Sequence, residues 1–253
     1  MTMPRMAMVL AAGLGLRMRP LTEKLPKPLI PVAGKAMLDR VLDHLAESGV
    51  GACVVNTHHQ GEMIAEHLAD RESPKVRLAP EPELLETGGS VNRALDELGP
   101  GPFFVVNGDV VWRDGEAPAL QRLAGAWDDE EMDALLLLQG KARAIGYDGA
   151  GDFFIDPEGE RLGTLHRRQQ GAGAPFVFTG IQLLHPRLFD PAPGGRFSLN
   201  LLYDAALARG RLFGLVHDGE WFHIGTPEGL ELAESHLGAA GPEVAKKAAD
   251  DTP

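Results

Sequence analysis

The sequence predicts an α/β protein whose central sheet is mixed but mostly parallel. Short apolar runs of the kind that form buried strands alternate with segments of helical periodicity over roughly the first 110 residues. The length of 253 residues suits one large domain or two small ones, and it is enough to bury a substantial core. The 31 glycines and 19 prolines are dispersed between apolar runs, which is typical of a globular chain with many loops.

In the first half, strands and helices are expected to alternate in βαβ units. The apolar run Ala7–Ala12 ends at Gly13, as a buried strand entering a glycine turn does. Apolar residues spaced three and four apart predict a helix over residues 37–45, with Gly49 just beyond its end. Further strands are expected at residues 53–55, 76–78 and 103–106, and further helices at residues 64–68 and 87–98. Parallel sheets of this kind bind ligands at the carboxyl ends of their strands.

The second half is less regular. The acidic run Asp128–Asp133 is expected to be a solvated loop, and the apolar run after it, residues 134–138, a strand. Short strands at residues 153–155, 161–165 and 176–178 are expected to add antiparallel strands to the sheet. No change of composition marks a second domain, so we expect one domain over residues 1–238 and a disordered tail over residues 239–253.

The charge balance excludes some classes of partner and site. The chain has 24 Lys and Arg residues against 36 Asp and Glu residues, a formal net charge of −12. We therefore expect no nucleic-acid partner, and any bound phosphate must be held by a local site. Cys53 is the only cysteine, which rules out an intramolecular disulfide and a zinc site made of several thiolates.

A cytoplasmic location is expected, with no membrane partner. No segment reaches the roughly 18 consecutive apolar residues that a membrane span needs. Residues 1–8 contain one arginine and run directly into a short apolar strand, without the longer apolar stretch and the small-residue cleavage site of a secretory leader.

The most informative segment is the glycine turn after the first strand. A strand that enters Gly13-Leu14-Gly15 lets backbone N–H groups approach a phosphate. The dinucleotide fingerprint needs a third glycine where Met18 stands, which argues against a nicotinamide dehydrogenase, and the Walker motif is absent. Arg17 offers a fork for phosphate oxygens, and Lys27 offers a point charge. The alternative interpretation is a glycine turn flanked by surface cations.

A candidate metal ligand follows the strand at residues 103–106. Asp109 comes directly after the turn Asn107-Gly108, and a carboxylate at a strand end suits Mg²⁺, which takes few protein carboxylates together with phosphate oxygens and water. The alternative is an Asx-type turn.

These motifs resemble those of the sugar-1-phosphate nucleotidyltransferases. The family signature has the form L-A-A-G-x-G-x-R, then P-L-T, then P-K-P-L, and the chain carries it over residues 10–29. The resemblance spans roughly residues 5–237 and implies a Rossmann-like, three-layer, GT-A-like nucleotidyltransferase fold. It is strongest to short bacterial enzymes that join UTP to N-acetylmuramate 1-phosphate, which would place the chain in peptidoglycan recycling. Shared motifs are residues 85–89, 106–110, 151–153, 180–181 and 184–186.

The resemblance implies that a sugar 1-phosphate attacks the α-phosphorus of a nucleoside triphosphate and that pyrophosphate leaves. Arg17 would grip the β- and γ-phosphates, and Lys27 would steady the charge on the α-phosphate and the incoming sugar phosphate. The implied nucleotide-binding residues are Leu10, Ala11, Ala12, Gly13, Gly15, Glu81, Thr87, Gly88, Gly89 and Asn107. The implied sugar-binding residues are Gly146, Gly151, Asp152, Thr179 and Gly180. Thr87 is also expected to cap a helix.

The second metal position departs from the family pattern. Where the family has an aspartate before Gly-Thr, this chain has His223. Imidazole suits Mn²⁺ better than Mg²⁺. Three interpretations stay open. His223 ligates a metal beside Asp109, so that Mn²⁺ supports activity; it contacts phosphate or a metal-bound water while Asp109 and the phosphates hold Mg²⁺; or the site is degenerate.

Several alternatives remain at the level of the sequence. GTP and mannose 1-phosphate are the second substrate pair, and a non-catalytic subunit that binds nucleotide sugars is the alternative class of function. Residues 166–168, His-Arg-Arg, either bind the sugar phosphate or a carboxylate of the sugar, or form a solvated turn. The oligomeric state, monomer or dimer, is open.

Overall fold

The computed structural model describes residues 2–157, 160–190 and 192–239. A nine-stranded sheet forms its centre, in the order β10-β11-β13-β8-β12-β6-β1-β4-β5. Strands β5, β4, β1, β6, β8 and β13 all run in one direction, and β12 lies antiparallel between β6 and β8. The predicted α/β class, with a mixed and mostly parallel sheet, is confirmed.

The first half of the chain follows the predicted βαβ pattern. Strands β1 (Met6–Leu10), β4 (Ala52–Thr57), β5 (Lys75–Pro80) and β6 (Phe103–Asn107) are parallel neighbours. Helices α1 (Met37–Glu47), α2 (Gly61–His67) and α3 (Glu86–Leu98) connect them. Gly49 follows the end of α1 with φ +91°, in the left-handed region where glycine is the favoured residue.

The second half adds the predicted antiparallel strands. Strands β8 (Ala134–Gly140), β10 (Phe153–Asp156), β11 (Leu162–Arg167) and β12 (Phe176–Leu184) all lie in the main sheet, with β13 (Leu212–Val216) between β11 and β8. The expected strand at 176–178 continues much further, past an irregularity between Phe178 and Gln182. The far edge of the sheet curls back, so that Phe153 of β10 pairs with Phe176 of β12.

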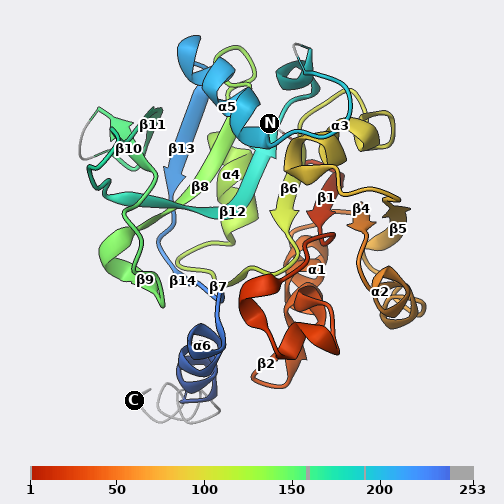
Figure 1. Ribbon diagram of the computed structural model, residues 1–253. Coiled ribbons are helices and arrows are strands. Elements are labelled where there is room, and N and C mark those ends of the chain that lie inside the picture. Colours follow the sequence, from red (N-terminus) through yellow and green to blue (C-terminus); the bar gives the residue numbers. More distant parts are fainter. Residues whose placement is uncertain (1, 158–159, 191, 240–253) are drawn as a thin grey trace, which may run out of the picture.

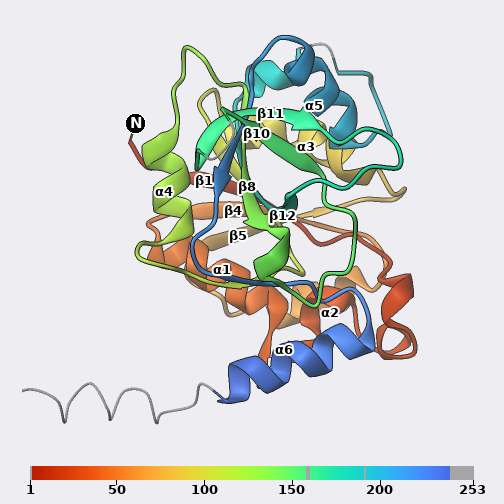
Figure 2. The same ribbon diagram turned by 90° about the vertical axis from the view of Figure 1, so that its left-hand side faces the viewer.

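Helices cover both faces of the sheet, giving three layers (Figures 1 and 2). Side chains of β1 alternate between the faces, because successive residues of a strand point to opposite sides. Val9 belongs to the core under α1, α2 and α4 (Ala119–Ala126), whereas Met8 belongs to the core under α3 and α5 (Leu199–Ala208).

A third apolar cluster lies outside the main sheet and anchors the glycine loop. Met18, which is fully buried, packs there with Phe222, Ile224 and Ala233. Phe222 belongs to a small sheet made of β7 (Val111–Arg113), β14 (Glu220–Phe222) and β9 (Ala144–Ile145), and Ala233 lies on α6 (Pro227–Ala239). A hairpin of β2 (Pro31–Val32) and β3 (Lys35–Ala36) completes the strands.

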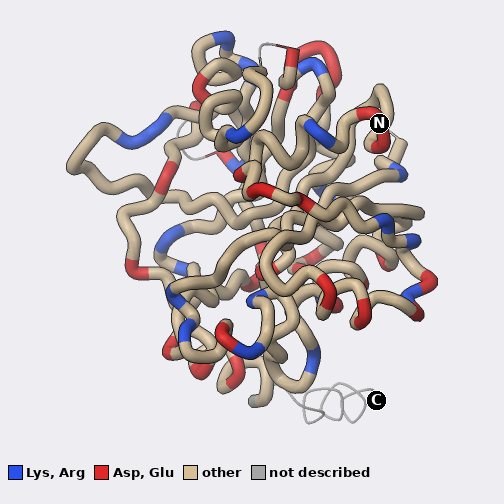
Figure 3. The backbone as a smooth tube through the Cα atoms, turned by 45° about the vertical axis from the view of Figure 1, so that its right-hand side comes forward, with Lys and Arg blue, Asp and Glu red and all other residues tan. Residues whose placement is uncertain are grey.

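Charged residues of both signs are interspersed along the backbone (Figure 3). Among the described helices, none combines the length and the apolar composition that crossing a membrane would require. The last described helix ends at Ala239, the first residue of the predicted tail over 239–253. The rest of that tail lies outside the described residues.

The acidic run 128–133 is not wholly the solvated loop that the sequence predicts. Asp133 is only 3% exposed, and its carboxylate accepts hydrogen bonds from Arg187 Nε at 2.8 Å, Arg211 Nε at 2.8 Å and Arg209 Nη2 at 3.2 Å. Burial pushes the pKa of the Asp133 carboxyl upward, but hydrogen bonds from Arg211 and Arg187 outweigh that effect and leave the pKa below its usual value. The arginines come from distant segments, which the sequence pattern does not reveal.

Replacing Asp133 with Asn should lower the free energy of unfolding by about 3–5 kcal/mol, since it leaves three guanidinium groups short of a buried counter-charge. The carboxylate contributes stability above its unfolded-state pKa of about 4, and this contribution is lost as the pH falls through its lower folded-state pKa. Urea unfolding at neutral and acidic pH should therefore show that Asp133→Asn loses less stability on acidification than the unsubstituted protein.

Glu131→Gln is the matched control for that measurement. Glu131 lies in the same run but is exposed, so its substitution should change the unfolding free energy by no more than about 0.5 kcal/mol. Equal effects of the two substitutions would mean that the buried ion cluster does not stabilise the fold.

Candidate active site

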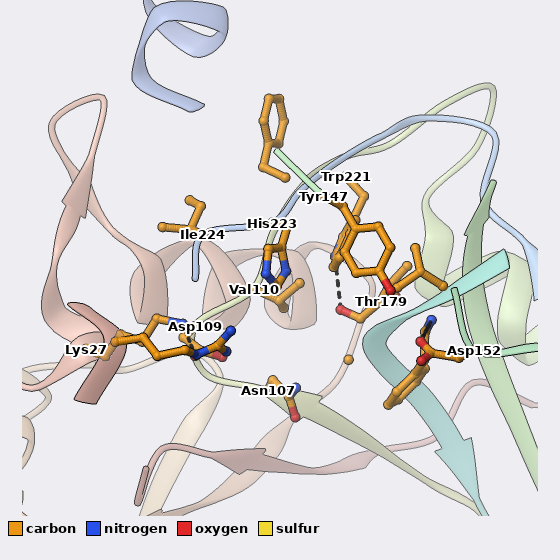
Figure 4. A pocket seen from close by; sticks show the side chains of 15 residues that line it. Lys27, Asn107, Asp109, Val110, Tyr147, Asp152, Thr179, Trp221, His223 and Ile224 are labelled. Atoms are coloured by element: carbon orange, nitrogen blue, oxygen red, sulfur yellow. Dashed lines mark hydrogen bonds and ion pairs between the residues drawn. The ribbon is translucent and has the colours of Figure 1, made fainter. Parts of the chain in front are cut away.

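A pocket of about 280 Å³ opens at the carboxyl ends of β1 and β6 (Figure 4). The lining includes eight of the residues singled out from the sequence, which come from segments spread over the whole chain: Arg17, Lys27, Asn107, Asp109, Asp152, Thr179, Gly180 and His223. These residues therefore gather at the carboxyl ends of the parallel strands, where the βαβ pattern predicts that a ligand binds.

The glycine loop leaves β1 at Leu10 and turns at Gly15. Gly15 has φ +60°, and a Cβ there would lie 2.8 Å from Thr22 Cγ2 and 3.1 Å from Lys27 Cβ, so both the backbone conformation and the space require glycine. The Thr22 hydroxyl donates to the Gly15 carbonyl at 2.9 Å. A Cβ on Gly13 would have nothing within 4 Å, so this side of the loop is open.

Lys27 and Asp109 form an ion pair inside the pocket, with Lys27 Nζ 2.6 Å from Asp109 Oδ2. The pair joins the short helical turn η3 (Lys27–Leu29) to the loop after β6. The Lys27 side chain is 13% exposed and the Asp109 side chain 33%, so both charged groups remain reachable from the pocket.

The position of Asp109 follows from the pairing of β1 with β6. Leu10 and Asn107 lie in register at the ends of the two strands, and the next N–H, that of Gly108, donates to the Leu10 carbonyl at 2.9 Å. A Cβ on Gly108 would lie 3.2 Å from that carbonyl oxygen. The tight contact turns the chain so that Asp109 emerges beside the glycine loop.

His223 enters the pocket from the segment after β14. Its backbone N–H donates to the Ile145 carbonyl at 2.8 Å, and its ring lies edge-on to Tyr147, with centroids 5.5 Å apart. Burial, and next the positive charges of Arg17 and Lys27, hold the pKa of the His223 imidazole below its usual value. The ring is therefore neutral near neutral pH and has a lone pair available for a ligand.

Arg17 is exposed at the mouth of the pocket. A Cβ placed on Gly225 would lie 3.4 Å from Arg17 Nη1 and 2.8 Å from His223 Nε2, so both side chains border the same glycine. Within residues 2–157, 160–190 and 192–239, the Arg17 guanidinium takes part in no hydrogen bond or ion pair, and it is free to meet an anion.

The predicted sugar residues fall into two groups. Asp152 lines the pocket: its N–H donates to the Phe176 carbonyl at 2.7 Å, and its Oδ2 accepts from the Phe178 N–H at 2.9 Å. Thr179 and Gly180 line it at the irregularity of β12, where a Cβ on Gly180 would lie 2.6 Å from the Nδ2 of Asn107.

Gly146 and Gly151, the other two predicted sugar residues, are not among those that line this pocket. Both have positive φ, +76° and +79°, and a Cβ on Gly151 would lie 2.2 Å from the Ala174 carbonyl oxygen. Backbone conformation and close packing therefore account for these glycines, and a role in binding sugar stays a prediction.

The predicted base-binding stretch lies outside this pocket, at the start of α3. The N–H groups of Gly88 and Gly89 donate to the Phe197 carbonyl at 2.9 and 3.0 Å, and the Phe197 ring lies where a Gly88 side chain would be. Thr87 does not cap α3 as predicted. Its hydroxyl instead accepts from the Leu199 N–H at 2.9 Å, because the segment before α5 crosses the first turn of α3.

Glu81, the remaining base candidate, is 5% exposed and lies at the end of β5. Its carboxylate accepts from Asn56 Nδ2 at 2.8 Å and from the Leu85 N–H at 3.2 Å. The predicted nucleotide residues Leu10, Ala11 and Ala12 form the last residue of β1 and the start of the glycine loop.

Sequence reasoning misses the aromatic residues of the pocket, which include Tyr147 and Trp221. Tyr147 lines it beside His223, and its hydroxyl accepts from the Gly151 N–H at 3.1 Å. Trp221 also lines it, and its Nε1 donates to the Thr179 carbonyl at 3.0 Å. Their positions beside the predicted Gly146 and His223 are the only signal in the sequence, and an aromatic residue alone does not distinguish a pocket wall from a core.

His166 and Arg167 lie in a strand, β11, and not in the solvated turn that was one interpretation of residues 166–168. Arg167 Nε lies 2.5 Å from Asp204 Oδ1 of α5. This ion pair accounts for Arg167 without a substrate.

The donor set suits a cation that takes few protein ligands. In the described part of the chain, no three His, Cys, Asp or Glu side chains are grouped closely enough to hold a metal ion by themselves. Asp109 and neutral His223 line one pocket together with the phosphate-binding candidates Arg17 and Lys27. Such a pair fits a metal that completes its coordination with phosphate oxygens and water.

Comparison with known proteins identifies the family. The family model for nucleotidyl transferases matches residues 6–147. The chain is 39% identical over 242 residues to an N-acetylmuramate alpha-1-phosphate uridylyltransferase of Caulobacter vibrioides, covering 94% of this chain and 98% of the relative. It is 38% identical over 229 residues to mannose-1-phosphate guanylyltransferase 1 of Arabidopsis thaliana, covering 87% of this chain and 61% of the relative.

A solved structure agrees with the fold. UDP-glucose pyrophosphorylase from Acinetobacter baumannii matches with a TM-score of 0.76 at 19% identity, over 97% of each chain. The family model spans more than half of the sequence, and the Caulobacter relative aligns along nearly its whole length. The chain therefore belongs to the nucleotidyl transferase family.

Proposed function

We propose that the chain transfers a nucleoside monophosphate from a nucleoside triphosphate to a sugar 1-phosphate, releasing pyrophosphate, with UTP and N-acetylmuramate 1-phosphate as its substrates. The observation that carries the proposal is the meeting of Arg17, Lys27 and Asp109 in one pocket beside the glycine loop. The Caulobacter relative, whose name gives this reaction, supports the choice of substrates. A cytoplasmic role in peptidoglycan recycling follows from that choice.

The pocket brings two cations together in an acidic protein, although two carboxylates, Asp109 and Asp152, also line it. Lys27 and Arg17 both line it, whereas the chain as a whole has a net charge of −12. The open side of Gly13 leaves room for a phosphate or base to approach the backbone. A triphosphate can therefore be held locally, by two cations and backbone N–H groups, against the repulsion of the chain's overall charge.

The reaction requires positioning and neutralisation of charge rather than a covalent nucleophile. A phosphate oxygen of the sugar 1-phosphate forms the new bond to the α-phosphorus, and the bond from the α-phosphorus to the pyrophosphate oxygen breaks. Lys27 would stabilise the negative charge on the α-phosphate and the incoming phosphate, and Arg17 that on the leaving pyrophosphate. Asp152 would accept hydrogen bonds from sugar hydroxyls.

Asp109 and His223 would hold a divalent cation, which when bound supplies charge neutralisation at the phosphates. Asp109 is the partner of Lys27 in the structure, so if Asp109 held a cation, Lys27 Nζ would be available to a phosphate. The neutral imidazole of His223 is a better ligand for Mn²⁺ than for Mg²⁺, so both metals are candidates.

Two other functions compete with this one. The Arabidopsis relative supports GTP and mannose 1-phosphate as the second substrate pair. A non-catalytic subunit that binds nucleotide sugars is motivated by His223 in place of a carboxylate. A protein that only binds would have no chemical need for Arg17, Lys27 and Asp109 together in one pocket, which favours the enzyme.

Pyrophosphate release over a grid of substrates tests the function. UTP, GTP, dTTP, CTP and ATP are each paired with the 1-phosphates of N-acetylmuramate, N-acetylglucosamine, mannose and glucose, with Mg²⁺ and with Mn²⁺. We expect the fastest turnover with UTP and N-acetylmuramate 1-phosphate. Turnover with GTP and mannose 1-phosphate instead would select the second pair, and nucleotide binding without any turnover would favour the binding subunit.

Lys27→Ala should reduce kcat/KM by about 10²–10³, the scale of losing one preorganised charge that stabilises a transition state. The substitution also frees Asp109, so the folded state should be checked by circular dichroism before pyrophosphate release is measured.

Lys24→Ala is the matched control for this effect. Lys24 is an exposed lysine of the same segment and does not line the pocket with Arg17 and Asp109. Its substitution should leave turnover within about twofold. Turnover by Lys27→Ala at the same level as Lys24→Ala would refute the role assigned to Lys27.

His223→Asp should shift the metal preference from Mn²⁺ toward Mg²⁺, because a carboxylate oxygen suits Mg²⁺ better than an imidazole nitrogen. Two measurements check this: the ratio of turnover rates with the two metals, and Mn²⁺ affinity by electron paramagnetic resonance without sugar phosphate. If neither changes, His223 does not ligate the metal.

A further inference from the structure

A buried asparagine that the pocket does not include connects three segments of the proposed nucleotide site. Asn56 lies near the end of β4, in register with Leu10, and is 3% exposed. Neither the sequence motifs nor the proposed mechanism assigns it a role. A buried polar side chain without hydrogen-bond partners is costly, and the Asn56 side chain finds all of its partners inside the protein.

The Asn56 carboxamide has one orientation that satisfies its neighbours. Its Oδ1 accepts from the Ala11 N–H at 2.8 Å, and its Nδ2 donates to Glu81 Oε1 at 2.8 Å and to Ser90 Oγ at 3.0 Å. A backbone N–H can only donate and an ionised carboxylate can only accept, so the reverse orientation would lose both of those bonds.

The bond to Ala11 lies where the chain leaves the sheet. The pairing of β1 with β4 ends at Leu10 and Asn56, and the next backbone N–H, that of Ala11, is met by the Asn56 side chain. The side chain thus takes the place of one further bond between strands. This bond fixes the direction in which the glycine loop departs toward Gly15.

The bonds to Glu81 and Ser90 extend the same network to α3. The second carboxylate oxygen of Glu81 accepts from the Leu85 N–H at 3.2 Å, and the Ser90 hydroxyl donates to the Glu86 carbonyl at 2.6 Å. Glu81 and Ser90 are 5% and 4% exposed, so the network is shielded from water. Hydrogen bonds in such surroundings hold their partners more tightly than in water.

We propose that Asn56 is a positioning residue for the nucleoside triphosphate. It holds the start of the glycine loop, the end of β5 and the first turn of α3 in one arrangement, and thereby sets nucleotide affinity without contacting the nucleotide. The inference rests on the proposed function, because these three segments carry the predicted nucleotide-binding residues.

The test is an exchange of donor and acceptor between Asn56 and Glu81. Asn56→Asp keeps an acceptor for the Ala11 N–H but places a carboxylate against that of Glu81. Glu81→Gln alone leaves an amide that can serve either Asn56 Nδ2 or the Leu85 N–H through its oxygen, but not both. In the double variant the new amide donates to the new carboxylate and still accepts from the Leu85 N–H, so these two bonds are restored with the total charge unchanged. The bond that Asn56 Nδ2 donates to Ser90 Oγ is not restored, because a carboxylate has no proton to donate.

Calorimetry with UTP and with GTP, in the presence of Mg²⁺, measures dissociation constants and the fraction of competent sites. We expect Asn56→Asp to weaken binding of the preferred nucleotide by about tenfold or more, by analogy with the loss seen when a group that hydrogen-bonds a metal ligand is removed. The double variant should recover at least half of that loss on a logarithmic scale. The KM for the sugar 1-phosphate, measured at saturating nucleotide, should change less than about threefold.

Asp133→Asn is the control for a purely structural defect. It breaks a buried ionic network just before β8, at the amino-terminal end of the parallel strands and so away from the pocket. The substitution should lower the melting temperature without changing nucleotide affinity. If Asn56→Asp behaves in the same way, or if the double variant binds no better than Asn56→Asp, the inference is wrong. Failure of the unsubstituted protein to bind any nucleotide would instead refute the proposed function.

Discussion

The arrangement of the site depends on one constraint, the parallel pairing of β1 with β6. Their last residues, Leu10 and Asn107, lie in register, and both strands run toward the same edge of the sheet. The glycine loop and Asp109 must therefore leave the sheet side by side. The Gly108 N–H bond to the Leu10 carbonyl tightens that exit, and Lys27 then closes the gap between the two segments through its ion pair with Asp109.

The rest of the pocket comes from strands that do not follow the parallel pattern. β12 runs against its neighbours, and its irregularity brings Gly180 against Asn107 and Thr179 beneath Trp221. His223 is positioned by the small sheet, through its backbone bond to Ile145, and not by the main one. The phosphate candidates and the metal candidate Asp109 thus come from one half of the chain. The metal candidate His223 and the sugar candidates come from the other half, which is built differently.

This division explains what the sequence can and cannot predict. Alternating patterns and a glycine turn are local, so the sequence predicts the strands of the first half, the loop and the exit of Asp109. The same reasoning places Asp133 in solvent, because its three arginines lie more than fifty positions away in the chain. It also expects Thr87 to cap its own helix, but the segment before α5 takes its hydroxyl. Tyr147 and Trp221 carry no pattern that distinguishes a pocket wall from core packing.

The glycines of the motifs show that a motif residue can be required by packing as well as by a ligand. Gly15 is required by its backbone and by Thr22, and Gly88 by the ring of Phe197, so a motif glycine can be needed for packing even where a ligand also benefits. Gly13 differs, since nothing in the described fold occupies the space beside it. An alanine at Gly13 would cost the fold little by contact, so a strict need for glycine there would have to come from what approaches the loop. The part of the motif that packing explains least is therefore the part that points most directly to a ligand.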